Sequence, residues 1–197
     1  MSIEIEVESC TIPLVDDKRL QQLCGLWQKQ LAISKDISGY AGPGLKRHAA
    51  RLLARMLARE RSGCAFSYSG STAFCAHADG SPIAVDAVNC NEGNAGSIVD
   101  FLKRSGLGIT RRTDSAILRS WSVCEALLKL SGNGITWPGL KNIASLPVWQ
   151  RCGHFRASAG TVHWRAMPLP GHWLCVAAYQ DPNIKYSHVH YMEPGIN

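Results

Sequence analysis

The chain has 197 residues, of which 46% are hydrophobic and 18% are charged, and its formal net charge is +6. This composition is typical of a globular protein with one well-buried core, and it excludes a disordered or low-complexity chain. No stretch approaches the ~20 consecutive apolar residues that span a bilayer, so we expect no membrane partner. Residues 2–8 include glutamates at positions 4, 6 and 8 and lack the basic and apolar regions of a secretory signal. We therefore expect a cytoplasmic protein, or one delivered to another cell without a classical signal peptide.

The first 62 residues are predicted to form the helical part of the fold. Residues 3–15 alternate between apolar and polar side chains, which predicts an opening strand. Helical spacing of apolar residues then predicts two helices, one over residues 18–31 and one from about residue 45 to residue 61. A glycine-rich break separates them.

Residues 63–197 are predicted to form the core that would carry any catalysis. Short apolar runs between turns indicate strands, and helical spacing indicates helices. The predicted elements are strands at 64–68, 72–78 and 83–88, helices at 95–104 and 115–130, and strands at 161–167, 172–179 and 186–192. We expect the last three strands to form an antiparallel meander. The sequence thus predicts a single α+β domain over residues 1–197, with helices followed by a C-terminal antiparallel sheet.

The eight cysteines are interpreted as buried free thiols, because the chain is large and shows no secretory signal. Two Cys-x-His pairs, at residues 75–77 and 152–154, and the pair His188 and His190 are potential metal ligands. Their spacing differs from that of structural zinc sites. Asp79 follows the first pair where zinc deaminases carry glutamate, and the second deaminase motif is missing. We predict no metal and no cofactor.

The C-terminal strands hold the strongest candidate for catalytic chemistry. His172 opens one predicted strand, and Glu193 closes the next. The two ends would lie side by side in an antiparallel hairpin. A carboxylate beside an imidazole fixes its tautomer and holds it as a general base. Asp181, in the turn between the strands, is interpreted as a turn former. The alternative is a solvated histidine at a strand edge.

This part of the chain resembles the histidine half of papain-like cysteine hydrolases, especially the C39-like peptidases and the related bacterial papain-fold toxins and effectors. Gly171-His172-Trp173 opens an apolar strand, and Glu193 precedes Pro194, as in those families. The resemblance implies a papain-like fold, with His172 as the base and Glu193 as the acid that orients it. It also implies a cysteine nucleophile at the start of an upstream helix, where the helix N-terminus and the base activate the thiol. Trp173 is interpreted as lining the cleft.

The resemblance places the nucleophile within residues 89–106. Asn94-Ala95-Gly96-Ser97 fits the family pattern, but with alanine in the place of the nucleophile. Three interpretations stay open: a Cys-to-Ala substitution at Ala95, Cys90 as the nucleophile in a shifted register, or a non-catalytic relative. Asn91 and Glu92 are the nearest candidates for side chains around an oxyanion.

The function that the resemblance implies is that of a papain-like cysteine protease or glutamine deamidase acting on a protein or peptide, as an effector or toxin. The alternative is a non-enzymatic binding protein. Four arginines recur at every fourth residue of the second predicted helix: Arg47, Arg51, Arg55 and Arg59. This spacing predicts one basic helix face, for which an acidic protein is the expected partner. Nucleic acid is the less favoured partner, because no aromatic-rich binding motif accompanies the arginines.

Overall fold

The computed structural model describes residues 2–59, 61–91, 95–104, 113–132 and 134–190. In chain order its elements are β1 (Ser2–Thr11), α1 (Asp17–Gln30), α2 (Gly42–Ala58), β2 (Ala65–Ser69), β3 (Thr72–His77), β4 (Ile83–Asn89), α3 (Ala95–Arg104), α4 (Asp114–Leu130), α5 (Trp137–Ile143), β5 (Cys152–Ala157), β6 (Gly160–Leu169), β7 (His172–Ala178) and β8 (Asp181–His188).

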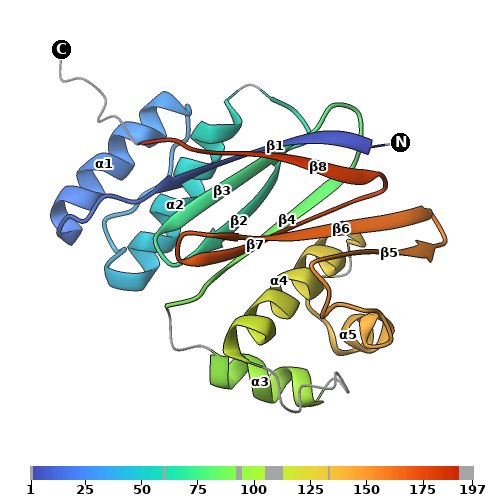
Figure 1. Cartoon of the computed structure of the whole chain (residues 1–197). Coiled ribbons are helices and arrows are strands. Elements are labelled where there is room, and N and C mark those ends of the chain that lie inside the picture. The colour runs from blue at the N-terminus through green and yellow to red at the C-terminus, as the bar shows by residue number, and fades with distance from the viewer. Residues whose placement is uncertain (1, 60, 92–94, 105–112, 133, 191–197) are drawn as a thin grey trace.

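The strands form two four-stranded sheets, which lie face to face (Figure 1). The first sheet has the order β2-β3-β1-β8, and β8 runs parallel to β1. The second sheet has the order β4-β7-β6-β5 and is antiparallel throughout. The chain therefore enters the second sheet at β4 and returns to the first at β8.

Helices cover the outer face of each sheet, so the molecule has four layers, α-β-β-α (Figure 1). On the first sheet, α2 packs against β1, β2 and β3, and α1 packs against α2. On the second sheet, α4 packs against β4, β6 and β7, with α3 and α5 beside it. A separate core fills the space between the sheets, and its fully buried large side chains are Ile5, Val7, Phe74, Val85, Leu174 and Val176. Neither sheet can bury its inner face alone.

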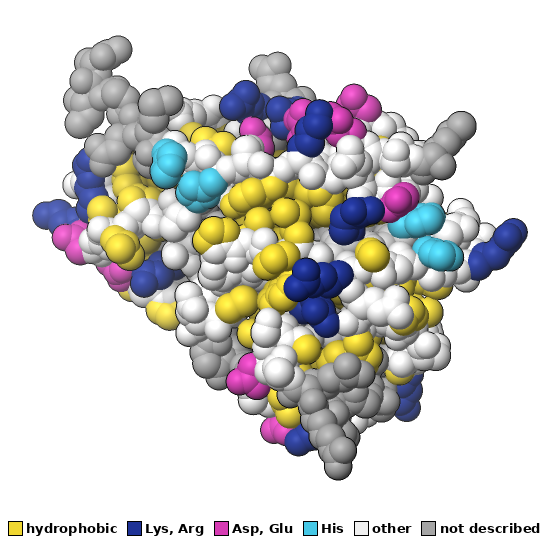
Figure 2. All heavy atoms as spheres, viewed as in Figure 1, with side chains coloured by type: hydrophobic (Ala, Val, Ile, Leu, Met, Phe, Trp, Pro, Cys, Tyr) yellow, Lys and Arg dark blue, Asp and Glu magenta, His cyan; other side chains and the backbone are white. Residues whose placement is uncertain are grey.

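The inter-sheet core reaches the surface on the side where β8 lies near β6 and β7. Figure 2 shows hydrophobic side chains gathered at the centre of this face. Its partly buried members include Ile3, Met167, Leu169, Ile184 and Tyr186, and all of them pack on the inter-sheet core. This surface is therefore the rim of the core.

The edge strands β2 and β4 are joined through one side chain. The Ser67 hydroxyl accepts a hydrogen bond from the Ala87 N–H at 3.0 Å and donates one to Asp86 Oδ1 at 3.1 Å. Ser67 thus gives a partner to a backbone amide that the sheet ladder does not use.

The predicted mixture of helices and strands is confirmed, and α3 has the predicted bounds. The predicted overall order, helices followed by a C-terminal antiparallel sheet, is not confirmed. Four strands precede α3, and the last strand, β8, pairs with β1 in the first sheet. The elements α5 and β5 were not predicted. Within the described residues, no helix is long and apolar enough to cross a membrane.

The predicted pairing of the last two strands is wrong. β7 lies between β4 and β6, so both of its edges are already hydrogen-bonded. β8 starts at Asp181, earlier than predicted, and pairs with β1 instead. Asp181 is therefore a strand residue rather than a turn former, and its carboxylate lies 3.3 Å from the Arg165 guanidinium.

Candidate functional site

The end of the β4–β7 pair holds several of the residues that the sequence singled out. His172 lies opposite Asn89 in the ladder, and the Cys90 N–H donates to the Gly171 carbonyl at 2.8 Å. The Asn91 N–H donates to Asn89 Oδ1 at 2.7 Å, in a tight turn that follows the strand. The structure thus brings Cys90, Asn91 and His172 to one end of the second sheet.

The environment of His172 does not suit a general base for Cys90. Its Nδ1 lies 3.1 Å from the Pro170 carbonyl oxygen, and its Nε2 lies 3.4 Å from the Ser69 carbonyl oxygen. Its ring also makes an edge contact with Phe74, at 5.4 Å between centroids. Carbonyl oxygens only accept hydrogen bonds, so both nitrogens face groups that favour N–H donation. An imidazole held in this way has no free lone pair directed at a thiol.

The environments of Trp173 and Cys90 differ from the expectation. Trp173 is buried against α4, where its indole N–H donates to Ser115 Oγ at 3.0 Å, so it does not line a cleft. Burial raises the pKa of the exposed Cys90 thiol above its usual value, which disfavours the thiolate. Ala95 is the first residue of α3. Glu92 and Glu193 lie outside the described residues.

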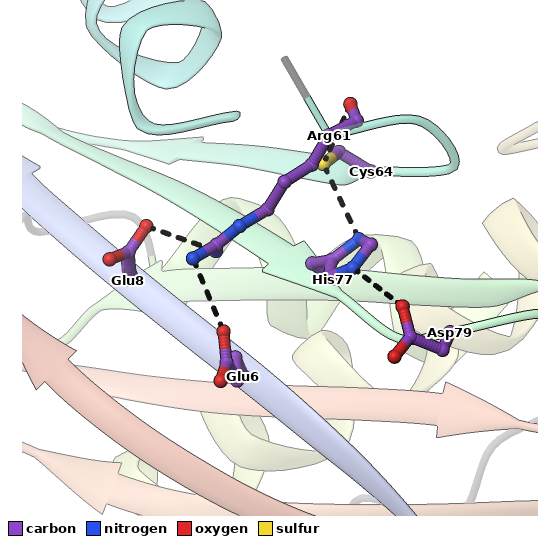
Figure 3. A network of polar contacts seen from close by, with 6 residues as sticks. All are labelled: Glu6, Glu8, Arg61, Cys64, His77 and Asp79. Carbon is purple, nitrogen blue, oxygen red and sulfur yellow. Dashed lines mark hydrogen bonds and ion pairs between the residues drawn. The ribbon is translucent and has the colours of Figure 1, made fainter. Parts of the chain in front are cut away.

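A thiol, an imidazole and a carboxylate come together instead on the outer face of the first sheet (Figure 3). Cys64 immediately precedes β2, and the β2–β3 ladder, continued by one residue, puts it opposite His77. Cys64 Sγ lies 3.9 Å from His77 Nδ1, and His77 Nε2 lies 3.2 Å from Asp79 Oδ1. An N–H on Nε2 that donates to Asp79 leaves the lone pair of Nδ1 directed at the thiol. This tautomer is the one that a general base for Cys64 requires.

This Cys64–His77–Asp79 line lies beyond the C-terminal end of α2, and its central His77 side chain is 19% exposed. The Arg61 guanidinium lies 3.3 Å from Glu6 and 3.4 Å from Glu8 on β1 (Figure 3). Two cavities, of about 300 and about 350 Å³, border His77 and Asp79. The imidazole and the carboxylate are therefore reached from solvent on two sides.

Most other thiols lie in the cores, where they are poor nucleophiles. Burial raises the pKa of Cys10 and of Cys24 to about 11, and that of Cys124 to about 12. Burial and the neighbouring Cys64 raise the pKa of Cys75 further. These thiols stay protonated near neutral pH, so they can be set aside as nucleophiles.

The four arginines at every fourth residue, here called the arginine row of α2, are all exposed to solvent. Arg47, Arg51 and Arg55 are exposed on the helix, and the exposed Arg59 follows its last residue. The opposite helix face is buried, with Leu45, Leu52 and Leu53 in the core between α1, α2 and the first sheet. The row is thus a solvent-facing cationic surface, as the spacing predicts.

The residues that could hold a metal ion are spread over the fold. Cys75 and His77 lie on β3 of the first sheet, whereas Cys152 and His154 lie on β5 of the second. In the part of the chain that the structure describes, no three His, Cys, Asp or Glu side chains gather as a metal site would require.

No protein-family model matches the sequence, and no curated protein sequence matches it.

Sequence reasoning singled out His77 and Asp79 only as part of a weak metal motif, and it missed Cys64. The missing step was strand register. A hairpin that pairs Ser69 with Thr72 also places residue 64 opposite residue 77. The predicted strands at 64–68 and 72–78 therefore contained the signal that brings the thiol and the imidazole together.

Proposed function

We propose that the protein is a thiol hydrolase of amide bonds, with Cys64 as the nucleophile, His77 as the general base and Asp79 as the positioning acid. The observation that carries the proposal is the unbroken line of contacts from Cys64 Sγ through both ring nitrogens of His77 to the Asp79 carboxylate. A nucleophile, a base and a third group that orients the base are the arrangement that covalent catalysis needs. The proposal retains the enzyme class that the sequence implied and moves its nucleophile and base to another sheet.

The proposed reaction has two halves. In the first, His77 Nδ1 takes the Cys64 proton, Sγ attacks the amide carbonyl carbon, and the carbon–nitrogen bond breaks as the imidazolium protonates the leaving amine. In the second, His77 deprotonates a water that attacks the thioester, and the proton returns to Sγ as the sulfur–carbon bond breaks. The substrate is a peptide bond or a glutamine side chain of a protein or peptide.

Thiol reactivity tests the assignment. Brief limiting alkylation with iodoacetamide at about pH 5.5, read by mass spectrometry, labels a thiol that is held as a thiolate and spares ordinary ones. We expect selective labelling of Cys64 over Cys90 and Cys152, which are both exposed and serve as internal controls. The selectivity should disappear in His77→Ala and persist in His172→Ala.

Hydrolysis is then measured with fluorescent casein for peptide cleavage and by ammonia release from casein for deamidation. We expect one of these activities in the wild type and none in Cys64→Ala. Selective labelling of Cys90 that depends on His172 would instead establish the site that the sequence predicted. Equal labelling of all accessible thiols, together with no hydrolysis, would exclude a thiol enzyme.

A second candidate function is binding of an acidic protein through the arginine row of α2. The specific observation that favours it is the exposure of all four side chains, three on α2 and Arg59 directly after it. Binding to polyglutamate should weaken steeply as the salt concentration rises, because opposite charges on exposed surfaces are screened. The Arg51→Gln/Arg55→Gln variant should lose this binding, whereas thiol labelling should be unchanged.

A further inference from the structure

A cavity of about 550 Å³ lies between α2 and α4, on the side of the molecule where β4 ends. It is lined by Lys46 and Arg47 of α2, the β2–β3 turn from Tyr68 to Ser71, the end of β4, Ile98 of α3, and Trp121 and Glu125 of α4. Five separate elements thus converge on one space. The volume is that of a pocket for a small organic molecule.

One wall of the cavity is cationic. Lys46 and Arg47 are exposed and lie near the N-terminal end of α2, where the helix dipole adds partial positive charge. Pro43 of the same helix also lines the cavity. The first backbone N–H of α2, that of Gly42, already donates to Asp17 Oδ2 at 2.7 Å, so the helix end itself has a carboxylate partner. An anion at this wall would be attracted by the two full charges of Lys46 and Arg47.

The opposite wall ends in two neighbouring carboxyl groups, those of the buried Asp86 and the partly buried Glu125. Asp86 is 2% exposed, and its Oδ1 accepts hydrogen bonds from Lys129 Nζ at 2.6 Å and from Ser67 Oγ at 3.1 Å. Its Oδ2 is buried and has no hydrogen-bond partner among the described residues. The Glu125 carboxyl lies within hydrogen-bonding reach of Asp86.

A proton on Glu125 would supply the donor that Asp86 Oδ2 lacks. A protonated carboxyl group has one O–H to donate, and a hydrogen bond from it would satisfy the buried oxygen. Burial first, and then the neighbouring Asp86, raises the pKa of Glu125 to about 8. Glu125 therefore presents a neutral carboxyl group to the cavity at neutral pH, and the charge of the cavity comes from Lys46 and Arg47.

We propose that this cavity binds a small organic anion, a carboxylate or a phosphate monoester, with an aromatic or apolar body. The charged end lies against Lys46 and Arg47, and the body lies against Trp121, Ile98 and Val88, which supply the apolar part of the lining. The Tyr68 and Ser69 side chains of the β2–β3 turn offer further donors. The proposal is independent of Cys64, which lies elsewhere on the first sheet.

The affinity should depend on pH, because ionised Glu125 would place a negative charge on the wall facing the ligand. The groups that face Glu125 from the elements around it are Asp86 of β4, Lys129 and Cys124 of α4 and, across the cavity, Lys46, Arg47 and Tyr68. Cys175 of β7 lies behind them, next to Asp86 and Cys124. Burial raises the pKa of Cys175 and of Tyr68, and that of Cys124 to about 12, so these three stay neutral up to pH 8.

The test is an amide chemical-shift titration of the full chain with benzoate and with phenyl phosphate. We expect shifts at the amides of Ser69, Gly70 and Ser71 and at the Trp121 indole, with benzyl alcohol and benzylamine binding more weakly than either anion. If phenyl phosphate binds more tightly than benzoate, a phosphate monoester is the better ligand. If benzoate binds more tightly, a carboxylate is the better ligand. The Lys46→Gln/Arg47→Gln variant should bind benzoate at least about tenfold more weakly.

Two controls make the result specific. The Arg55→Gln/Arg59→Gln variant removes the same charge from the far end of the arginine row and should bind benzoate as the wild type does. Benzoate stays ionised from pH 6.5 to pH 9, so a loss of affinity over this range comes from a group of the protein that titrates and not from the ligand. Glu125→Gln should abolish this loss. No shifts at the cavity with either anion, or equal binding by the Lys46→Gln/Arg47→Gln variant, would overturn the proposal.

Discussion

Asp86 is the residue for which burial and charge conflict most strongly. Its carboxylate is 2% exposed, and a charge this deep is tolerated only when it is paired and hydrogen-bonded. Lys129 supplies the counter-charge, Ser67 supplies a hydroxyl, and Glu125 completes the set when it carries a proton. These side chains come from β2, β4 and α4, so the cluster ties the edges of both sheets to a helix.

Glu125 makes the stability of the fold depend on pH. Its pKa rises from an ordinary value of 4.5 to about 8 in the folded state, so the folded chain holds this proton more tightly than the unfolded chain does. The resulting stabilisation is complete below pH ~4.5 and is lost as the pH rises through about 8. We predict that urea unfolding yields a lower free energy of unfolding at pH 8.5 than at pH 6.

The Glu125→Gln variant keeps a neutral donor for Asp86 and removes the titration. Its stability should change much less between the two pH values. The exposed Glu4, which pairs with Lys185, provides a matched control, and Glu4→Gln should retain the pH dependence of the wild type. A wild-type protein with equal stability at both pH values would contradict a shared proton.

The position of the candidate site was only partly predictable from the sequence. Cys90 and His172 do lie at the same end of one sheet, because the strands that carry them were predicted correctly. What the sequence could not predict was the direction of the His172 ring, whose nitrogens face the carbonyls of Pro170, in the β6–β7 turn, and of Ser69, at the end of β2. Ring direction depends on packing around the side chain, whereas strand position depends on local pattern.

At the scale of single elements, the β5–β6 hairpin depends on a glycine. A Cβ placed on Gly153 would lie within 3 Å of three ring atoms of Trp164. Trp164 is 1% exposed and belongs to the core under α4, so its ring cannot move away cheaply. The Trp164 indole packs directly on the backbone here, so only glycine fits at position 153.

Gly153→Ala should therefore destabilise the protein by about 1–3 kcal/mol, the usual cost of overpacking a core. Gly25 in the middle of α1 is the matched control, because a Cβ there meets nothing within 4 Å. Gly25→Ala should stabilise the protein by about 0.5–1 kcal/mol, because alanine favours a helix interior. Chemical denaturation of both variants measures the change in the free energy of unfolding and its sign. If Gly153→Ala left this free energy unchanged, the Trp164 ring would be free to shift.

Elements with a strong local pattern were the ones that sequence reasoning found. α3 and the strands β2, β3 and β4 follow from apolar spacing and turn residues. The two missed elements lack such a signal. α5 is only seven residues long and begins with Trp-Pro-Gly, and β5 is an edge strand whose residues are at best half-buried. Tertiary contacts, rather than local preference, hold these segments.

At the scale of the whole molecule, the chain closes on itself. β8 crosses from the second sheet to the first and pairs with β1 from Ser2 to Ser9 in parallel register (Figure 1). The alternating Ile3, Ile5 and Val7 of β1 offer an apolar inner face, and Ile184 and Tyr186 of β8 continue it. This pairing joins segments separated by almost the full chain, which local sequence patterns do not specify.

The two sheets should therefore unfold as one unit, because each needs the other to cover its inner face. Ile5 on β1 and Leu174 on β7 are both fully buried in the inter-sheet core, and each substitution by alanine should cost about 2–5 kcal/mol. Native-state hydrogen exchange distinguishes shared from separate unfolding. Each variant should lower the protection of β3 amides in one sheet and β7 amides in the other by the same free energy. If Ile5→Ala weakened only the first sheet and Leu174→Ala only the second, the sheets would be independent units, and the crossing of β8 would connect two modules without coupling their stability.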